Sequence, residues 1–165
     1  MAKYGGRVDE NWKLEGCLIG RGTWRNFLGE KTRFNNKGEY GFTVFLPESL
    51  FHDMEEAGWY VKHKEQYAGD PREFQLDVSF TFDKYPPNIT MISSDGKTAI
   101  ITEENVALLQ NADFESCDIV IRPHNWTNED KGDSGVKAFL SEMEVRLRKP
   151  YHSRRASFDE DAYEE

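Results

Sequence analysis

The most constraining feature of this sequence is a strict alternation of apolar and polar residues between Phe74 and Phe82. Apolar side chains occupy positions 74, 76, 78, 80 and 82, and the positions between them are polar. Successive side chains of a β-strand point to opposite faces, so the pattern predicts a strand with one face in a core and the other in solvent. A chain of 165 residues can bury such a core without disulfides or a metal ion.

Short strand-like runs separated by turn signals account for most of the remaining chain. They lie at 13–19, 23–27, 31–34, 40–46, 59–64, 89–92, 98–101, 117–122 and 136–147. Two short helices are predicted, one from Pro47 to Gly58 and one from Thr102 through Gln110. Without an internal repeat or a strand–helix–strand rhythm, the pattern predicts a mainly β fold. We expect an OB-fold-like antiparallel barrel of five or more strands with one or two short helices.

The last predicted strand changes register in its middle. Val136, Ala138 and Leu140 fall on one face, and the apolar series resumes at positions 143, 145 and 147. This one-residue slip near Ser141-Glu142 predicts a β-bulge, a feature that is common where a strand bends round a barrel.

Charge is distributed unevenly along the chain. The formal net charge is −9, but residues 156–165 contain five acids and no base, whereas residues 1–37 contain eight bases and four acids. The beginning is therefore locally basic and the end acidic. We expect a flexible N-terminal arm at 1–11, a nucleic-acid-binding barrel at 12–150 and a disordered acidic tail at 151–165.

Several classes of protein are disfavoured by the sequence. Cys17 and Cys117 are far apart and have no CxxC partner, which does not suggest a disulfide framework or a zinc site. No signal peptide or membrane span is apparent, so we expect a cytoplasmic protein with no membrane partner. The histidines show no metal-binding spacing and no catalytic motif occurs, so we expect no cofactor, no metal and no enzyme activity.

Rings and cations alternate between Trp24 and Tyr40. Single-stranded nucleic-acid binders need this mixture, because rings stack on bases of any identity while cations follow the phosphates. The alternative is a core hairpin whose rings face inward and whose charges face water. A single face shared by Arg25 and Phe27, which mixes a cation with a ring, favours the binding interpretation.

Two further segments resemble parts of a binding groove. The run from Arg122 to Trp126 could grip a base and its phosphate, or Trp126 could cap the barrel while Arg122 pairs with an acid. The run from Trp59 to Lys64 could extend the groove through Lys62, although a solvated strand face is slightly favoured. The predicted stacking residues are Trp24, Phe27, Phe34, Tyr40 and Trp126. The predicted phosphate contacts are Arg25, Lys31, Arg33, Lys62, Arg122 and Lys137.

The tail combines acids with spaced rings. Such a segment suits docking on a basic, partly apolar pocket of another protein, and it could also compete with nucleic acid for the protein's own groove. A solubilising tail is the alternative. The residues predicted to bind partners are Phe158, Asp159, Glu160, Asp161, Tyr163, Glu164 and Glu165.

Residues across positions 24–147 resemble a family of bacteriophage and prophage proteins. They are Arg25-Asn26-Phe27 with Gly29, Phe34-Asn35 with Gly38 and Phe42, Gly58-Trp59-Tyr60-Val61-Lys62, Pro86-Pro87-Asn88-Ile89, Gly96-Lys97-Thr98 with Glu103-Glu104 and Val106, Asp118 through Ile121-Arg122-Pro123-His124-Asn125-Trp126, and Gly135 to Leu140 with Met143 and Val145. The chain resembles phage single-stranded-DNA-binding proteins of the oligonucleotide-binding-barrel type. This resemblance implies protection of single strands in replication or recombination, with an acidic tail that recruits phage or host partners. The tail departs from the bacterial type, because it ends in Tyr163-Glu164-Glu165 rather than in Phe.

The sequence therefore predicts sequence-independent binding of single-stranded DNA by a non-enzymatic protein that could form a homo-oligomer. One alternative is a phage structural or adaptor module whose rings dock another protein subunit. A metal-dependent nuclease is a third reading, because carboxylate sites can assemble from distant strands.

Overall fold

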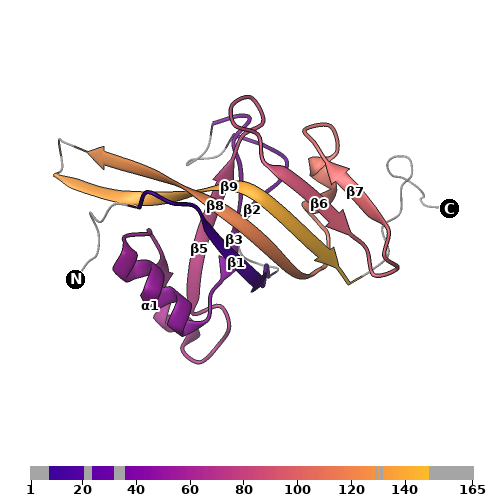
Figure 1. Cartoon of the computed structure of the whole chain (residues 1–165). Coiled ribbons are helices and arrows are strands. Elements are labelled where there is room, and N and C mark those ends of the chain that lie inside the picture. Colours follow the sequence, from indigo (N-terminus) through magenta and orange to yellow (C-terminus); the bar gives the residue numbers. More distant parts are fainter. Residues whose placement is uncertain (1–7, 21–23, 32–35, 129, 131, 149–165) are drawn as a thin grey trace.

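The computed structural model of the chain describes residues 8–20, 24–31, 36–128, 130 and 132–148 (Figure 1). Its strands are β1 (Trp12–Cys17), β2 (Arg25–Asn26), β3 (Tyr40–Phe45), β4 (Lys62–His63), β5 (Phe74–Phe80), β6 (Asn88–Ile92), β7 (Thr98–Ile101), β8 (Phe114–Asn128) and β9 (Asp133–Leu147). Its helices are α1 (Glu48–Ala57) and the short 3-10 helices η1 (Glu65–Tyr67) and η2 (Val106–Leu109). The predicted mainly β fold is confirmed.

Strand β9 is central to the sheet, because it pairs with three other strands. It pairs antiparallel with β8 along its length, while its opposite edge pairs parallel first with β5 and then with β6. The remaining pairs are antiparallel: β1 with β8, β3 and β4 with β5, β2 with β3, and β7 with β6. The barrel is thus mainly antiparallel with two parallel contacts, which hydrophobic alternation could not predict because it carries no information on strand direction.

The predicted β-bulge in the last strand is present at the predicted position. Val120 pairs with Glu142 and the next residue, Ile121, pairs with Leu140, so Ser141 is the extra residue of β9. The bulge separates the part of β9 that pairs with β5 from the part that pairs with β6. It therefore lets one strand serve two parts of the barrel wall, as bulges do where strands bend.

The core is centred on β3 and the aromatic side chains around it. All six residues of β3 are buried, since this strand lies between β2 and β5 in the sheet. The Phe27 ring stacks on Phe42 at a centroid distance of 5.4 Å and also contacts Phe80 and Phe114. Many of the aromatic residues in the composition therefore serve the core.

Helix α1 forms as predicted from Pro47 and Gly58. Pro47 stands immediately before the helix, where its missing N–H costs no hydrogen bond. Gly58 has φ 115°, and its N–H donates to the carbonyls of Met54 and Glu55. Glycine ends the helix in this left-handed conformation without a side-chain penalty. Phe51 and Met54 form the buried face of the helix.

Four local predictions differ from the structure. The predicted helix at 102–110 is a turn followed by η2, and the predicted strand at 59–64 is reduced to β4 with an isolated bridge from Trp59 to Val136. The predicted strand at 23–27 is reduced to β2, which pairs with β3, and residues 32–34 of the predicted strand at 31–34 lie outside the described residues. Strand β8 continues to Asn128, beyond Arg122, where the predicted strand at 117–122 ends.

Residues 8–11, the described part of the segment predicted as a flexible arm, include an anchored residue. Val8 is buried in the core, and its N–H and carbonyl exchange hydrogen bonds of 3.1 and 2.9 Å with the side chain of Asn125. Residues 1–7 lie outside the described part of the chain. The anchored segment therefore starts before the predicted boundary at residue 12.

The two cysteines are neighbours in space despite their separation in sequence. Cys17 of β1 and Cys117 of β8 are directly paired residues, and both are buried free thiols. Burial raises the pKa of Cys17 to about 12, and it also raises the pKa of the Cys117 thiol. Since the thiolate is the reactive form, these side chains behave as small core residues.

Candidate nucleic-acid interface

One side of β5, β9 and β8 faces away from the core, and we call it the outer face. Arg122 on β8 is paired with Phe139 on β9, which is paired in turn with Ser79 on β5. Paired residues in neighbouring strands share a face of the sheet. The residues next to Phe139, Ala138 and Leu140, are buried in the core, so the Phe139 side chain points outward.

The ring of Phe139 is the centre of a group of cations and rings on the outer face. The Arg122 guanidinium lies 5.2 Å from the ring centroid and the Lys137 ammonium 5.4 Å from it. The His124 ring stacks parallel to Phe139, with a centroid distance of 5.2 Å and an interplanar angle of 1°. Rings combined with cations in this way can hold both the bases and the phosphates of an unpaired strand.

A cavity of about 260 Å³ opens beside this group. Its lining includes Lys84, Tyr85, Arg122, His124, Lys137 and Phe139. Three cationic side chains in the lining face a single carboxylate, that of Glu39. The site is therefore positively charged although the whole chain carries a net charge of −9.

Two tryptophans lie against glycines on the same face. Trp126 is paired with Gly135, and a Cβ at Gly135 would lie 2.9 Å from Cζ2 of the indole. Trp24 covers Gly41 in the same manner, at the β2 side of the face. The absence of a side chain at each glycine lets the indole approach the backbone closely, and both indoles are half-buried.

Three residues predicted to bind nucleic acid have structural roles instead. Phe27 is 0% exposed, so its ring has no face available to a base. Tyr40 is 7% exposed and stacks on Phe80 at 5.3 Å, and it forms part of the cavity wall. Burial, followed by the charge of Glu103, raises the pKa of Tyr40. Both rings belong to the core cluster around β3, and the full burial of Phe27 contradicts the prediction that it stacks on bases.

Arg25 is the third, and its contacts explain why a cation shares a face with Phe27. Its guanidinium donates hydrogen bonds to the carbonyls of Leu109, Gln110 and Ala112 at the end of η2, and to that of Gly20. It also lies 4.4 Å from the Phe114 ring centroid. The Gln110 side chain adds two hydrogen bonds between the same segments: its amide oxygen accepts from the Phe27 N–H, and its amide nitrogen donates to the Arg25 carbonyl. The prediction of a phosphate contact by Arg25 is wrong, since this cation fastens η2 to β2.

The remaining predicted residues fall into three groups. Trp24, Trp126, Arg122 and Lys137 lie on the outer face, and the last two line the cavity. Lys31 is exposed away from the described lining, and Lys62 forms an ion pair with Asp77. Arg33, Phe34 and the tail residues from Phe158 to Glu165 lie outside the described residues.

Several residues of the cavity lining were missing from the predicted set, among them Lys84, Tyr85, His124 and Phe139. Phe139 could have been found, because it occupies the outward register between the inward residues Ala138 and Leu140. Tyr85 and Lys84 belong to the loop between β5 and β6, and no periodicity signals where a loop side chain points.

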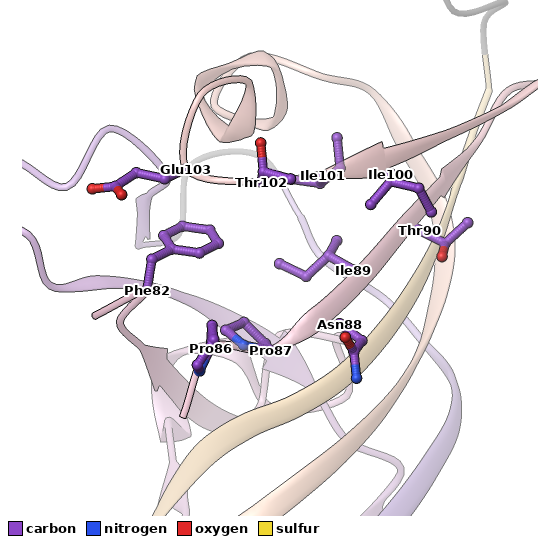
Figure 2. Close-up of a pocket in the computed structure, with 10 residues that line it drawn as sticks. All are labelled: Phe82, Pro86, Pro87, Asn88, Ile89, Thr90, Ile100, Ile101, Thr102 and Glu103. Atoms are coloured by element: carbon purple, nitrogen blue, oxygen red, sulfur yellow. The ribbon is translucent and has the colours of Figure 1, made fainter. Parts of the chain in front are cut away.

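A second cavity, of about 370 Å³, lies on the other side of the β5–β6 loop. Figure 2 shows Phe82, Pro87 and Ile89 around this cavity, with Glu103 near Phe82 at its rim. Its lining contains no cationic side chain. A carboxylate beside apolar walls does not attract phosphate, so this second cavity is not the continuation of the positively charged site.

Neither a metal-binding cluster nor a membrane-spanning helix occurs among the described residues. Among the described residues, no group of three or more His, Cys, Asp or Glu side chains could hold a metal ion. None of the helices in the described part of the chain is both long and apolar enough to cross a bilayer.

A small, mainly β barrel with one α-helix has an OB-fold-like architecture, a class that includes many nucleic-acid binders. The family described as "putative phage ssDNA-binding domain" matches residues 5–157. The chain belongs to this family, as its resemblance predicted.

Solved structures agree with this assignment at the level of the fold. The single-stranded DNA-binding protein from bacteriophage Enc34 in complex with ssDNA has a TM-score of 0.53 at 11% identity, covering 90% of this chain and 97% of that chain. A second structure of the Enc34 protein has a TM-score of 0.51 at 10% identity, covering 97% of this chain and 98% of that chain. The crystal structure of gp2.5, a single-stranded DNA-binding protein encoded by bacteriophage T7, has a TM-score of only 0.41 at 9% identity, covering 91% and 98%, and does not contribute to this agreement. No curated protein sequence matches the chain.

Proposed function

We propose that this protein binds single-stranded DNA on its outer face, without catalysis and with little sequence preference. The observation that carries the proposal is the Phe139 ring with Arg122, His124 and Lys137 around it, beside a cavity lined by three cations. In the described structure, none of these three outer-face residues around Phe139 forms an ion pair with a carboxylate.

An unpaired strand fits this site better than a duplex. Rings that lie on a sheet face can stack only on bases whose faces are accessible, and stacking tolerates every base because each has a π-face. Arg122, Lys137 and Lys84 would contact phosphates, while Trp126 and Trp24 would extend the stacking surface at the two sides of the face. Lys62 contributes less, since Asp77 already neutralises it.

We further propose that the chain acts in phage DNA replication or recombination and that its acidic end competes with DNA. Residues 156–165 carry five acids and no base, a composition that complements a cavity lined by Lys84, Arg122 and Lys137. The same segment would recruit phage or host replication proteins when DNA displaces it. A chain stopped after Arg155 should therefore bind single-stranded DNA more tightly than the whole chain.

Fluorescence anisotropy of a labelled dT oligonucleotide tests these proposals. The whole chain should bind at low salt, and its affinity should fall with salt with a slope of about −2 in log–log form, at about −0.7 for each of three phosphates. A double variant with Arg122→Ala and Lys137→Ala should show a slope of about −0.7. Absence of binding at low salt by both the whole chain and the shortened one would refute the proposed function.

A further inference from the structure

Tyr85 is the most unusual residue of the described structure. It lies in the loop between β5 and β6, its side chain is 71% exposed, and it is the one non-glycine residue with positive φ, at 54°, in the part of the chain that is described. Left-handed backbone is unfavourable for residues with a Cβ, and Pro86 restricts the preceding residue further. Strain of this kind persists where the surrounding structure enforces it, and it is concentrated at functional sites.

The loop holds Tyr85 in place from its two ends. Phe82 packs edge-on against Tyr40 at 5.2 Å and against Phe80 at 5.6 Å, and Pro87 is buried. Figure 2 shows Phe82 and Pro87 at the apolar cavity on the far side of the loop. Asp83, Lys84 and Tyr85, between these anchors, are exposed. The loop therefore presents Tyr85 to the positively charged cavity rather than to the core.

The contact that Tyr85 makes there is with Arg122. The guanidinium carbon lies 5.1 Å from the Tyr85 ring centroid and 5.2 Å from that of Phe139. Within the described residues, Arg122 takes part in no ion pair, so its cation is placed between two rings and is not neutralised by an acid. A cation held mainly by ring faces can leave them at low cost when a phosphate offers a stronger charge-assisted contact.

We propose that Tyr85 is a base-stacking residue, and that a nucleobase of bound single-stranded DNA stacks on its ring in the position that Arg122 occupies in the free protein. Arg122 then turns from the Tyr85 ring to the adjacent phosphate. The cavity of about 260 Å³ is smaller than the roughly 300–1,000 Å³ of pockets for drug-sized ligands, so it suits one base. This inference rests on the proposed function of the same face.

Two variants of Tyr85 separate the role of its ring from that of its hydroxyl. In anisotropy titrations of the whole chain with a dT oligonucleotide, Tyr85→Ala should lower affinity roughly 5- to 100-fold, as loss of a stacked ring does. Tyr85→Phe should bind within about twofold of the unchanged protein. Tyr67→Ala is the matched control, because Tyr67 also contacts a guanidinium, that of Arg72, at 4.3 Å but lies outside the cavity lining.

A photochemical experiment locates the contact without relying on affinity. An oligonucleotide with 5-iodo-deoxyuridine in place of dT is crosslinked to the whole chain, and the adduct is mapped after digestion with trypsin. Cleavage after Lys84 and Lys97 releases a peptide whose single aromatic residue is Tyr85. We expect the adduct on this peptide, and we expect it to disappear in Tyr85→Ala.

The outcomes distinguish this inference from the proposed function. If the unchanged protein does not bind the dT oligonucleotide, the proposed function fails and the inference fails with it. If the unchanged protein binds and Tyr85→Ala binds within twofold of it, the inference alone is overturned. Equal losses in Tyr85→Phe and Tyr85→Ala would also overturn it, because they would assign the contact to the hydroxyl instead of the ring.

Discussion

Two contacts between an arginine and a tyrosine lie beyond opposite ends of β5, and they differ in what holds the arginine. Before the strand, the Arg72 guanidinium lies 4.3 Å from the Tyr67 ring centroid and donates two hydrogen bonds, of 3.0 and 2.9 Å, to the carboxylate of Asp70. Tyr85 lies after the strand, and its partner is Arg122 of β8. The Arg122 guanidinium lies between the rings of Tyr85 and Phe139, without an acidic partner among the described residues. Figure 1 shows the two loops at the lower and upper ends of β5.

This difference teaches how to find a binding site in a chain that is rich in both rings and charges. A cation that is already paired with a carboxylate would lose that pair on binding DNA, so it gains little from a phosphate. A cation held only by rings gains a full charge-assisted contact. The Arg72 contact is therefore structural, and the Arg122 contact is available for a ligand.

Charge reversal at the two arginines should produce the largest difference in DNA affinity between the two contacts. Arg122→Glu should lower affinity for a dT oligonucleotide on the order of 100-fold at low salt, because it places a carboxylate where a phosphate is bound. Arg72→Glu should leave affinity within about twofold, although it adds the same negative charge. Anisotropy titrations measure both, and equal losses in the two variants would mean that net charge rather than position controls binding.

The salt dependence of DNA binding tests the same distinction between unpaired and paired cations, at Lys137 and Lys62. Lys137 lines the cavity, whereas Lys62 is neutralised by Asp77. Lys137→Ala should reduce the magnitude of the log–log salt slope by about 0.7, the value for one phosphate on a single strand. Lys62→Ala should leave the slope unchanged. A reduced slope in Lys62→Ala would show that paired cations also reach phosphates.

The fold was more predictable from the sequence than the site. The alternation over Phe74–Phe82, the helix ending at Gly58 and the bulge at Ser141 all follow from local periodicity and backbone preference, which tertiary contacts here reinforce. The face shared by Arg25 and Phe27 was also read correctly. The partners of this face were not predicted. The carbonyls that bind Arg25 lie at the end of η2, more than eighty positions away in sequence.

The predicted site residues that the structure brings together at the cavity include Arg122 on β8 and Lys137 on β9, whereas Tyr85 of the candidate site lies in a loop. Arg122, Trp126 and Lys137 were identified from residue type, and the strand pairing places them on one face. Tyr85 could not be placed, since its direction depends on a positive φ and on the packing of Phe82 and Pro87. Sequence patterns identify which residue types can bind, whereas long-range pairing decides which of them are available.

Backbone strain at Tyr85 predicts a smaller effect, on stability. Because φ is 54° at this position, Tyr85→Gly should be more stable than Tyr85→Ala by about 1 kcal/mol, since only glycine adopts this conformation without a side-chain penalty. In thermal unfolding this corresponds to about 2–4 °C in Tm. Equal Tm values for the two variants would show that the loop relaxes at no cost and that Tyr85 is not strained.

The smallest effect concerns the protonation of Asp70 at the structural contact. The side-chain hydrogen bond from Arg72 is the main cause that lowers the pKa of Asp70 to about 2. Since the folded pKa lies below the ordinary carboxyl value of about 3.9, the stabilisation is present above that value and is lost as the pH falls through about 2. NMR titration should show this low midpoint, and Arg72→Ala should return it toward the ordinary value. A midpoint near the ordinary value in the unchanged protein would show that Arg72 is not held by Asp70.

The most direct test of the central claim is a map of backbone amide shifts in the whole chain as a dT oligonucleotide is added. The account predicts that amides of Tyr85, Arg122, His124, Lys137 and Phe139 shift in a saturable manner, while those from Tyr67 to Arg72 stay unchanged. Saturable shifts confined to other parts of the chain, with the amides around Phe139 unmoved, would contradict the assignment of the DNA site to the outer face.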